Sequence, residues 1–147
     1  MKKSYLLLVA SLLLSFTAQA AVHVCTPAAN SLAWCLTQAD TLVLTDGVYE
    51  EAYTIKFETP GIVLRAAEGA KPVIRLTGEW TTLGLYATTT FDGITFDGTN
   101  VCYYPISAYG SDAGTYTFKN CEFTGWMYWA ISNHYESNTH VDNVLIE

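Results

Sequence analysis

The chain has 147 residues, half of them hydrophobic, and its fourteen acidic and seven basic residues give a net charge of -7. Two of the basic residues belong to the first positions, and the five that remain do not cluster. Nucleic-acid binding depends on clustered Lys and Arg that displace counterions. The composition therefore excludes a nucleic-acid partner and fits neutral glycans or bound cations better.

The first twenty residues have the layout of a secretory signal peptide. Lys2 and Lys3 form a basic start, an apolar run follows, and Ala18–Ala20 supplies the small residues of a cleavage site. A membrane anchor is the alternative, but the apolar run is shorter than the ~20 residues of a spanning helix. We therefore expect cleavage before Ala21, no membrane span, and a protein that is secreted, periplasmic or at the cell surface.

Residues 21–39 are predicted to form an N-terminal cap with a short helix. Asn30 or Ser31 can begin this helix, and Leu32 and Leu36 then lie on one face.

Four cysteines follow the signal peptide, and an exported chain can form disulfides. Cys25 and Cys35 both precede the repeats described below, so they are the predicted bridge among three pairings. Cys102 and Cys121 either form a second bridge or remain buried free thiols. No spacing typical of a zinc site is present, and no metal ligand is assigned.

From residue 40 to residue 147, short β-rich runs alternate with turn residues, and helical periodicity is absent. Apolar-x-apolar runs recur at intervals near twenty residues, which is typical of a solenoid. One series consists of Leu42–Leu44, Ile62–Leu64 and Leu83–Leu85, and a second begins at Ile55, Ile74 and Ile94. We expect the runs within each series to stack.

One six-residue pattern occurs three times, as "FDGITF" at Phe91–Phe96, "FKNCEF" at Phe118–Phe123 and "VDNVLI" at Val141–Ile146. Its apolar positions are predicted to stack inside a right-handed parallel β-helix, an all-β fold. Gly and Asn between them tolerate the left-handed backbone of a corner. Because the third copy stops in mid-strand, we expect either missing C-terminal coils or another chain at this open end.

The stretches Ala39–Tyr49 and Gly61–Ile74 resemble the opening coils of the pectin-lyase-like β-helix superfamily, in particular the chondroitinase-B and alginate-lyase type. Ala39 stands where that family usually has Gly. The resemblance implies a polysaccharide partner. In the family's lyases it also implies a basic catalytic residue and often a bound Ca²⁺, on coils beyond those that match. No residue of this chain matches such a catalytic motif, so no catalytic residue is assigned.

Aromatic residues crowd the later coils and give the best indication of a binding site. Trp126, Tyr128, Trp129 and Tyr135 are the candidate ligand-binding residues, since Tyr and Trp rings stack on sugars. The alternative is that these rings only pack the long loops against the solenoid. Tyr103, Tyr104 and Tyr109 belong to the same aromatic-rich region.

Charged side chains give weaker signals. Lys56, Arg75 and Glu122 are predicted to form a stripe on one outer face, which is more often solvated pairing than a site. The acidic residues of the later coils match no calcium-binding loop, and His134 and His140 fit exposed turns as well as a metal site.

Two functions follow from these observations. The first is an exported β-helical protein that binds or acts on polysaccharide, as the N-terminal part of a lyase. The second is a non-catalytic scaffold or glycan-binding module. The fold alone does not decide between them.

The signal-peptide prediction is testable on the exported protein. N-terminal sequencing is expected to begin at Ala21, and the intact mass to equal or exceed that of residues 21–147. Retention of Met1 on the exported chain would contradict the prediction.

Overall fold

The computed structural model describes residues 21–109, 114–133, 138–142 and 145–146. The predicted signal peptide, Tyr135 and His134 lie outside the described residues.

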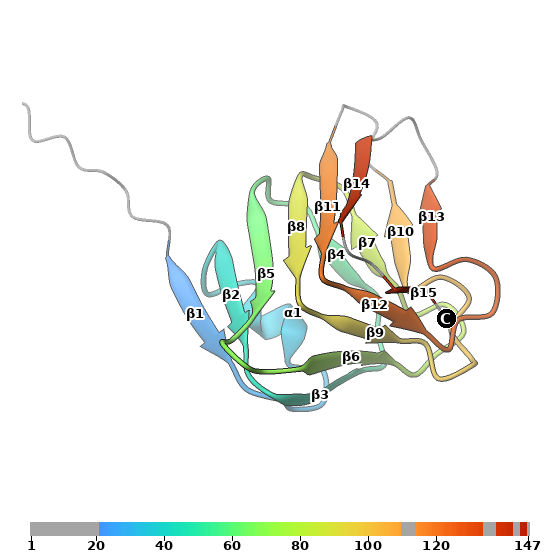
Figure 1. Cartoon of the computed structure of the whole chain (residues 1–147), viewed down its shortest axis with the longest axis horizontal. Coiled ribbons are helices and arrows are strands. Elements are labelled where there is room, and N and C mark those ends of the chain that lie inside the picture. The colour runs from blue at the N-terminus through green and yellow to red at the C-terminus, as the bar shows by residue number, and fades with distance from the viewer. Residues whose placement is uncertain (1–20, 110–113, 134–137, 143–144, 147) are drawn as a thin grey trace, which may run out of the picture.

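The chain forms a parallel β-solenoid of about four turns, with almost no helix (Figure 1). The complete turns contribute one strand to each of three sheets, and every strand pairing among the described residues is parallel. This confirms the all-β, β-helical class, while the handedness stays a prediction. The first sheet, sheet A, consists of β1 (Val22–Cys25), β2 (Thr41–Leu44), β5 (Ile62–Ala66), β8 (Thr89–Asp92), β11 (Thr115–Lys119) and β14 (Asn138–Asp142).

The other two sheets close the coil. Sheet B consists of β3 (Gly47–Glu51), β6 (Pro72–Leu76), β9 (Thr95–Asp97), β12 (Glu122–Thr124) and β15 (Leu145–Ile146). Sheet C consists of β4 (Ile55–Phe57), β7 (Leu83–Leu85), β10 (Ile106–Ala108) and β13 (Ile131–Asn133).

The N-terminal segment joins the solenoid and covers one of its edges. Strand β1 pairs with β2, so it already belongs to sheet A. The single-turn helix α1 (Leu32–Cys35) then lies beside β4, where sheet C would otherwise continue (Figure 1). Its N-cap is Ser31, and Leu32 is fully buried.

The repeated six-residue pattern stacks as predicted. Phe118 is in register with Phe91 and Val141, and Phe123 is in register with Phe96 and Ile146. The rings of Phe91 and Phe118 are parallel, with centroids 5.2 Å apart, and those of Phe96 and Phe123 lie 4.8 Å apart. These distances match the ~4.8 Å spacing of paired strands, so each buried ring contacts the ring of the next coil.

The residues between these strands form the predicted corners. Gly93 and Asn120 follow the first apolar position of their copies and have φ angles of 72° and 50°. The Asn120 amide also donates a hydrogen bond to the Asp92 carboxylate at 2.8 Å.

The stacking predicted for the two twenty-residue series is only partly confirmed. Two runs of each series lie on paired strands of one sheet, with the register shifted by two residues, but the remaining run of each series lies in sheet C. Leu42 is in register with Leu64 and not with Ile62, and Leu64 is followed in its column by Phe91. Ile55 is in register with Leu83 in sheet C, whereas Ile74 follows Tyr49 in sheet B. Apolar-x-apolar runs look alike in every sheet, and loops of unequal length separate them, so regular spacing grouped Leu83–Leu85 and Ile55–Phe57 with runs of other sheets.

The predicted charged stripe is therefore wrong. Lys56 lies on sheet C, while Arg75 lies on sheet B in register with Asp97, to which it forms an ion pair at 2.9 Å. Glu122 belongs to another column of sheet B, in register with Thr95. The three side chains do not form one row.

The stretch that resembles the pectin-lyase-like family has structural roles. Gly47 has φ of +125°, and a Cβ atom there would lie 2.6 Å from Cγ of Pro27. The buried Tyr49 hydroxyl donates to the Cys25 carbonyl at 2.6 Å, and burial raises the Tyr49 pKa. The Asp46 carboxylate accepts the backbone N–H of Lys71 at 2.9 Å. These residues shape a corner of the solenoid and anchor its core.

Glu51 connects sheet B to the N-terminal cap. Its side chain is 1% exposed, and its carboxyl oxygen accepts the backbone N–H of Leu32 at 2.9 Å. The first N–H groups of a helix have no partner within the helix, so this carboxyl group satisfies one from the core. Desolvation by burial raises the pKa of Glu51.

This raised pKa predicts a pH-dependent contribution to stability. A carboxyl group with a higher pKa in the folded state holds its proton more tightly when folded, so its contribution falls as pH rises above the ordinary value of 4.5. We expect the free energy of unfolding of the wild type, minus that of Glu51→Gln, to decrease from pH 4 to pH 7. Urea denaturation across this range measures it.

Glu50→Gln is the matched control, because it removes a carboxylate from the exposed face of the same strand. A difference between wild type and Glu51→Gln that stays constant or grows with pH would contradict the assignment.

Candidate aromatic binding site

Five aromatic side chains from three successive turns gather on one corner of the solenoid. They lie in the loops that lead from sheet B to sheet C, at residues 77–82, 98–105 and 125–130. We call this set the corner ladder, and it consists of Trp80, Tyr103, Tyr104, Tyr128 and Trp129.

The rings form two columns along the solenoid axis. In the first, the Tyr103 ring lies 4.7 Å from the Trp80 ring and 4.9 Å from the Tyr128 ring, between centroids. In the second, the Tyr104 and Trp129 rings are stacked, with centroids 5.6 Å apart and planes 11° from parallel. The spacing of both columns is close to that between strands, so the rings repeat once per coil.

The ladder is exposed although its rings touch. The exposed fractions are 68% for Trp80, 57% for Tyr128 and 59% for Trp129. Tyr103 and Tyr104 are half-buried between them. Contiguous exposed apolar patches are frequent at interaction surfaces, which makes the ladder the candidate binding site.

Backbone hydrogen bonds hold the three loops against one another. The N–H of Tyr103 donates to the Glu79 carbonyl at 2.9 Å, and the N–H of Met127 donates to the Cys102 carbonyl at 2.9 Å. The Thr54 hydroxyl of the preceding turn donates to the Trp80 carbonyl at 3.1 Å. The hydrogen bonding between neighbouring strands thus continues into the loops and sets the spacing of the backbone that carries the rings.

Loop 98–105 owes its shape to residues with left-handed backbone. Thr99 and Asn100 have φ angles of 55° and 58°, and the Asn100 N–H donates to the Gly125 carbonyl at 2.6 Å. The Asp97 carboxylate accepts the Thr99 N–H at 2.8 Å. Gly98 allows the loops to approach, since a Cβ atom there would lie 2.5 Å from the Gly125 oxygen.

A shallow hollow adjoins the ladder. It has a volume of about 280 Å³ and is lined by Trp129, Ile131, Ser132 and Asn133. The indole ring forms one wall, and the hydroxyl and amide side chains supply polar groups. An aromatic wall beside a few polar groups is the usual composition of a small-molecule site.

The structure places the sequence-predicted residues differently. Tyr128 and Trp129 belong to the ladder, whereas Trp126 is half-buried and packs against the hydrophobic core. Tyr135 lies outside the described residues. Trp80 was not among the residues predicted from the sequence. It precedes Tyr103 by 23 residues, and Tyr103 precedes Tyr128 by 25. This near-coil spacing was the signal that could have identified it.

One acidic group lies at the ladder. The Glu79 carboxylate, which is exposed, lies beside Tyr103 and raises the pKa of the Tyr103 hydroxyl by charge repulsion of its phenolate. The neighbouring phenols Tyr128 and Tyr104 act in the same direction.

A second aromatic pair covers the other end of the strands of sheet C. The rings of Tyr86 and Tyr109 are stacked with centroids 5.0 Å apart, and the Lys56 ammonium group lies 5.8 Å from the Tyr86 centroid. A Cβ atom on Gly84 would lie 3.1 Å from the Tyr86 ring, so the missing side chain lets this ring lie close to the sheet.

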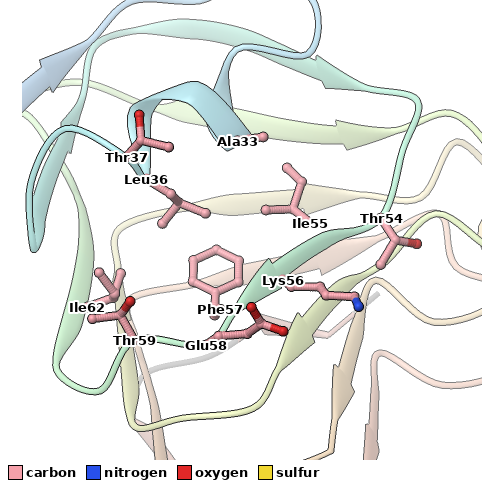
Figure 2. A pocket seen from close by; sticks show the side chains of 10 residues that line it. All are labelled: Ala33, Leu36, Thr37, Thr54, Ile55, Lys56, Phe57, Glu58, Thr59 and Ile62. Carbon is pink, nitrogen blue, oxygen red and sulfur yellow. The ribbon is translucent and has the colours of Figure 1, made fainter.

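A hollow of about 280 Å³ lies between α1 and β4 (Figure 2). Ala33 and Leu36 of the helix face Ile55 and Phe57 of the strand, and Lys56 points away from the helix. The hollow lies between the cap and the β4 edge of sheet C that the helix covers, and its lining is half apolar and half polar.

The cysteines provide no metal centre among the described residues. Ligand atoms of His23, Cys25 and Cys35 lie within 4.8 Å of one another, but the two cysteines form a disulfide and so offer no thiolates. Cys102 and Cys121 are free and buried, and burial raises the pKa of Cys102 to about 11. Both thiols behave as small core residues.

Comparison with known protein families, with curated proteins and with solved structures finds no match to this chain. Within the described residues, no helix has the length and hydrophobicity that crossing a bilayer requires.

The close approach of Gly98 to Gly125 predicts that Gly98→Ala disturbs the ladder. The added methyl group must push loop 98–105 away from loop 125–130, at a cost of about 1–3 kcal/mol in stability. We expect a lower midpoint in urea and a weaker near-UV circular dichroism signal from the coupled rings.

Gly69→Ala is the control, because φ there is +72° but nothing lies within 4 Å of the added Cβ atom. That variant should lose some stability through backbone strain and keep the near-UV signal. Equal near-UV spectra for Gly98→Ala and the wild type would contradict the account of the loops.

Proposed function

We propose that this protein is an exported β-solenoid that binds polysaccharide through the corner ladder. The observation that carries the proposal is the repetition of Trp and Tyr rings in three successive coils along the solenoid axis, exposed in the two outer coils and half-buried in the middle one. A linear polymer of like units meets such a surface with a repeated set of contacts. Each ring offers an apolar face to the C–H groups of a sugar, while its hydroxyl or N–H group can bond to sugar hydroxyls.

Pre-organisation supports this proposal. The rings contact one another, and backbone hydrogen bonds fix their loops, so little conformational freedom is left to lose on binding. The Trp129 hollow, with Ser132 and Asn133, offers polar contacts at one end of the ladder.

The hypothesis of a non-catalytic polysaccharide-binding protein is favoured over the hypothesis of a lyase. Elimination from a uronate needs a cation at the sugar carboxylate and a base near the α-proton. The ionisable groups that act on Tyr103 in the ladder are the Glu79 carboxylate and the hydroxyls of Tyr128 and Tyr104. We infer kinship with the pectin-lyase-like β-helices from the stretch Ala39–Tyr49, and this kinship concerns the fold and not the reaction.

A protein partner is the main competing occupant, because exposed aromatic residues also dominate protein interfaces. The binding experiment described next separates the two possibilities, since its panel contains polysaccharides and no protein partner.

The ladder predicts loss of glycan binding on removal of single rings. Trp129→Ala and Trp80→Ala are each expected to weaken binding at least about tenfold, since central aromatic anchors carry most of a binding energy. Binding is measured on a panel of neutral and acidic plant, algal and bacterial polysaccharides, followed by titration calorimetry on the best one.

Trp34→Ala is a closely matched control. Trp34 is 58% exposed, as Trp129 is, but it lies on α1 and contacts His23 instead of the ladder. It should bind as the wild type does. Equal losses in Trp34→Ala and Trp129→Ala, or no binding to any polysaccharide, would refute the proposal.

A further inference from the structure

We propose that the corner ladder selects uncharged glycans and discriminates against uronic-acid polymers, with Glu79 as the specificity-determining residue. This inference rests on the polysaccharide binding proposed above and goes further by naming the substrate class. It departs from the acidic polymers on which the lyases of the resembling family act.

Glu79 has the position that such a role requires. It directly precedes the exposed Trp80, and its carbonyl oxygen accepts the N–H of Tyr103 at 2.9 Å, so its exposed side chain starts beside two rings of the ladder. A sugar stacked on Trp80 or Tyr103 therefore lies within reach of this carboxylate. The carboxylate can accept hydrogen bonds from sugar hydroxyls, which favours a neutral ring, and it repels a uronate carboxylate.

The basic groups lie elsewhere on the described part of the chain. Arg75 is paired with Asp97 on sheet B, and Lys119 is in register with Asp92 on sheet A, as Arg65 is. Lys71 is in the turn between β5 and β6, where its N–H bonds to Asp46. Lys56 is on sheet C, with its ammonium group over the Tyr86 ring.

Lys56 lies over the Tyr86 ring, outside the ladder, and the net charge of -7 adds a general repulsion of polyanions. Hydroxyl and indole groups remain as the polar contacts of the ladder. These suit the hydroxyl groups of neutral sugars and leave a uronate carboxylate without a cationic partner.

The test compares each uronate polymer with its carboxyl-reduced form, which keeps the chain length and linkages but lacks the charge. Alginate, polygalacturonate and a glucuronan serve as the acidic members, and a β-glucan, a mannan and a galactan as neutral ones. We expect the best neutral or reduced polymer to bind at least about fivefold more tightly than any uronate at low ionic strength.

Glu79→Gln should reduce the ratio of uronate affinity loss to neutral-polymer binding, that is, bring the two dissociation constants closer together. Added salt should do the same in the wild type, because both changes weaken the repulsion between the ladder and the uronate carboxylates. Glu68→Gln is the matched control. It removes one exposed carboxylate from the turn between β5 and β6 and changes the net charge equally. It should leave the ratio unchanged.

The outcomes separate the two proposals. Uronate binding as tight as binding of the reduced form, still lost in Trp129→Ala, overturns the charge selectivity and leaves the ladder as the binding site. A ratio that Glu79→Gln and Glu68→Gln change equally overturns the role of Glu79. Absence of binding to every polymer overturns both proposals.

Discussion

The parallel register between successive coils is the constraint on which the structure depends. Each strand lies about 4.8 Å from the same strand of the next turn, so residues at equivalent positions are brought into contact whatever their chemistry. Inside the solenoid this register stacks Phe91 on Phe118 and Phe96 on Phe123. Outside it, the same register sets Trp80, Tyr103 and Tyr128 side by side. The core and the proposed binding surface are products of one geometry.

The register also holds the loops of the ladder against one another. A loop that carries an exposed ring would ordinarily move, but here each loop is bonded to the loop of the neighbouring turn. The tight turn at Gly98 and the left-handed residues Thr99 and Asn100 hold these loops together. The backbone, and not the ligand, therefore sets the ring spacing.

The N-terminal cap solves a different problem, which is the free edge of sheet C. Helix α1 lies against β4, and the disulfide between Cys25 and Cys35 connects it to β1. The buried carboxyl group of Glu51 satisfies the helix N–H of Leu32. An edge strand is thereby covered by a short helix whose polar end is bonded to the core, which is a common way to prevent edge-to-edge association.

Much of the fold could be predicted from the sequence, because the pattern around Phe91, Phe118 and Val141 combines spacing, alternation and corner residues. The sheet assignment of Ile55 and Leu83 could not, because a three-residue apolar run carries no mark of its sheet. The ladder was half predicted: Tyr128 and Trp129 stand out as a cluster, but Trp80 becomes their neighbour only through the register. Trp126, in the same cluster, packs on the core, and sequence alone does not distinguish the two orientations.

The most direct test of the ladder is a two-dimensional NMR titration that follows the four tryptophan indole N–H signals during addition of an oligosaccharide from the best-bound polymer. Each signal is assigned by single substitution. The account predicts that the signals of Trp80 and Trp129 shift together with one dissociation constant, while those of Trp34 and Trp126 stay in place. Shifts confined to Trp34 or Trp126, with Trp80 and Trp129 unmoved, would contradict it.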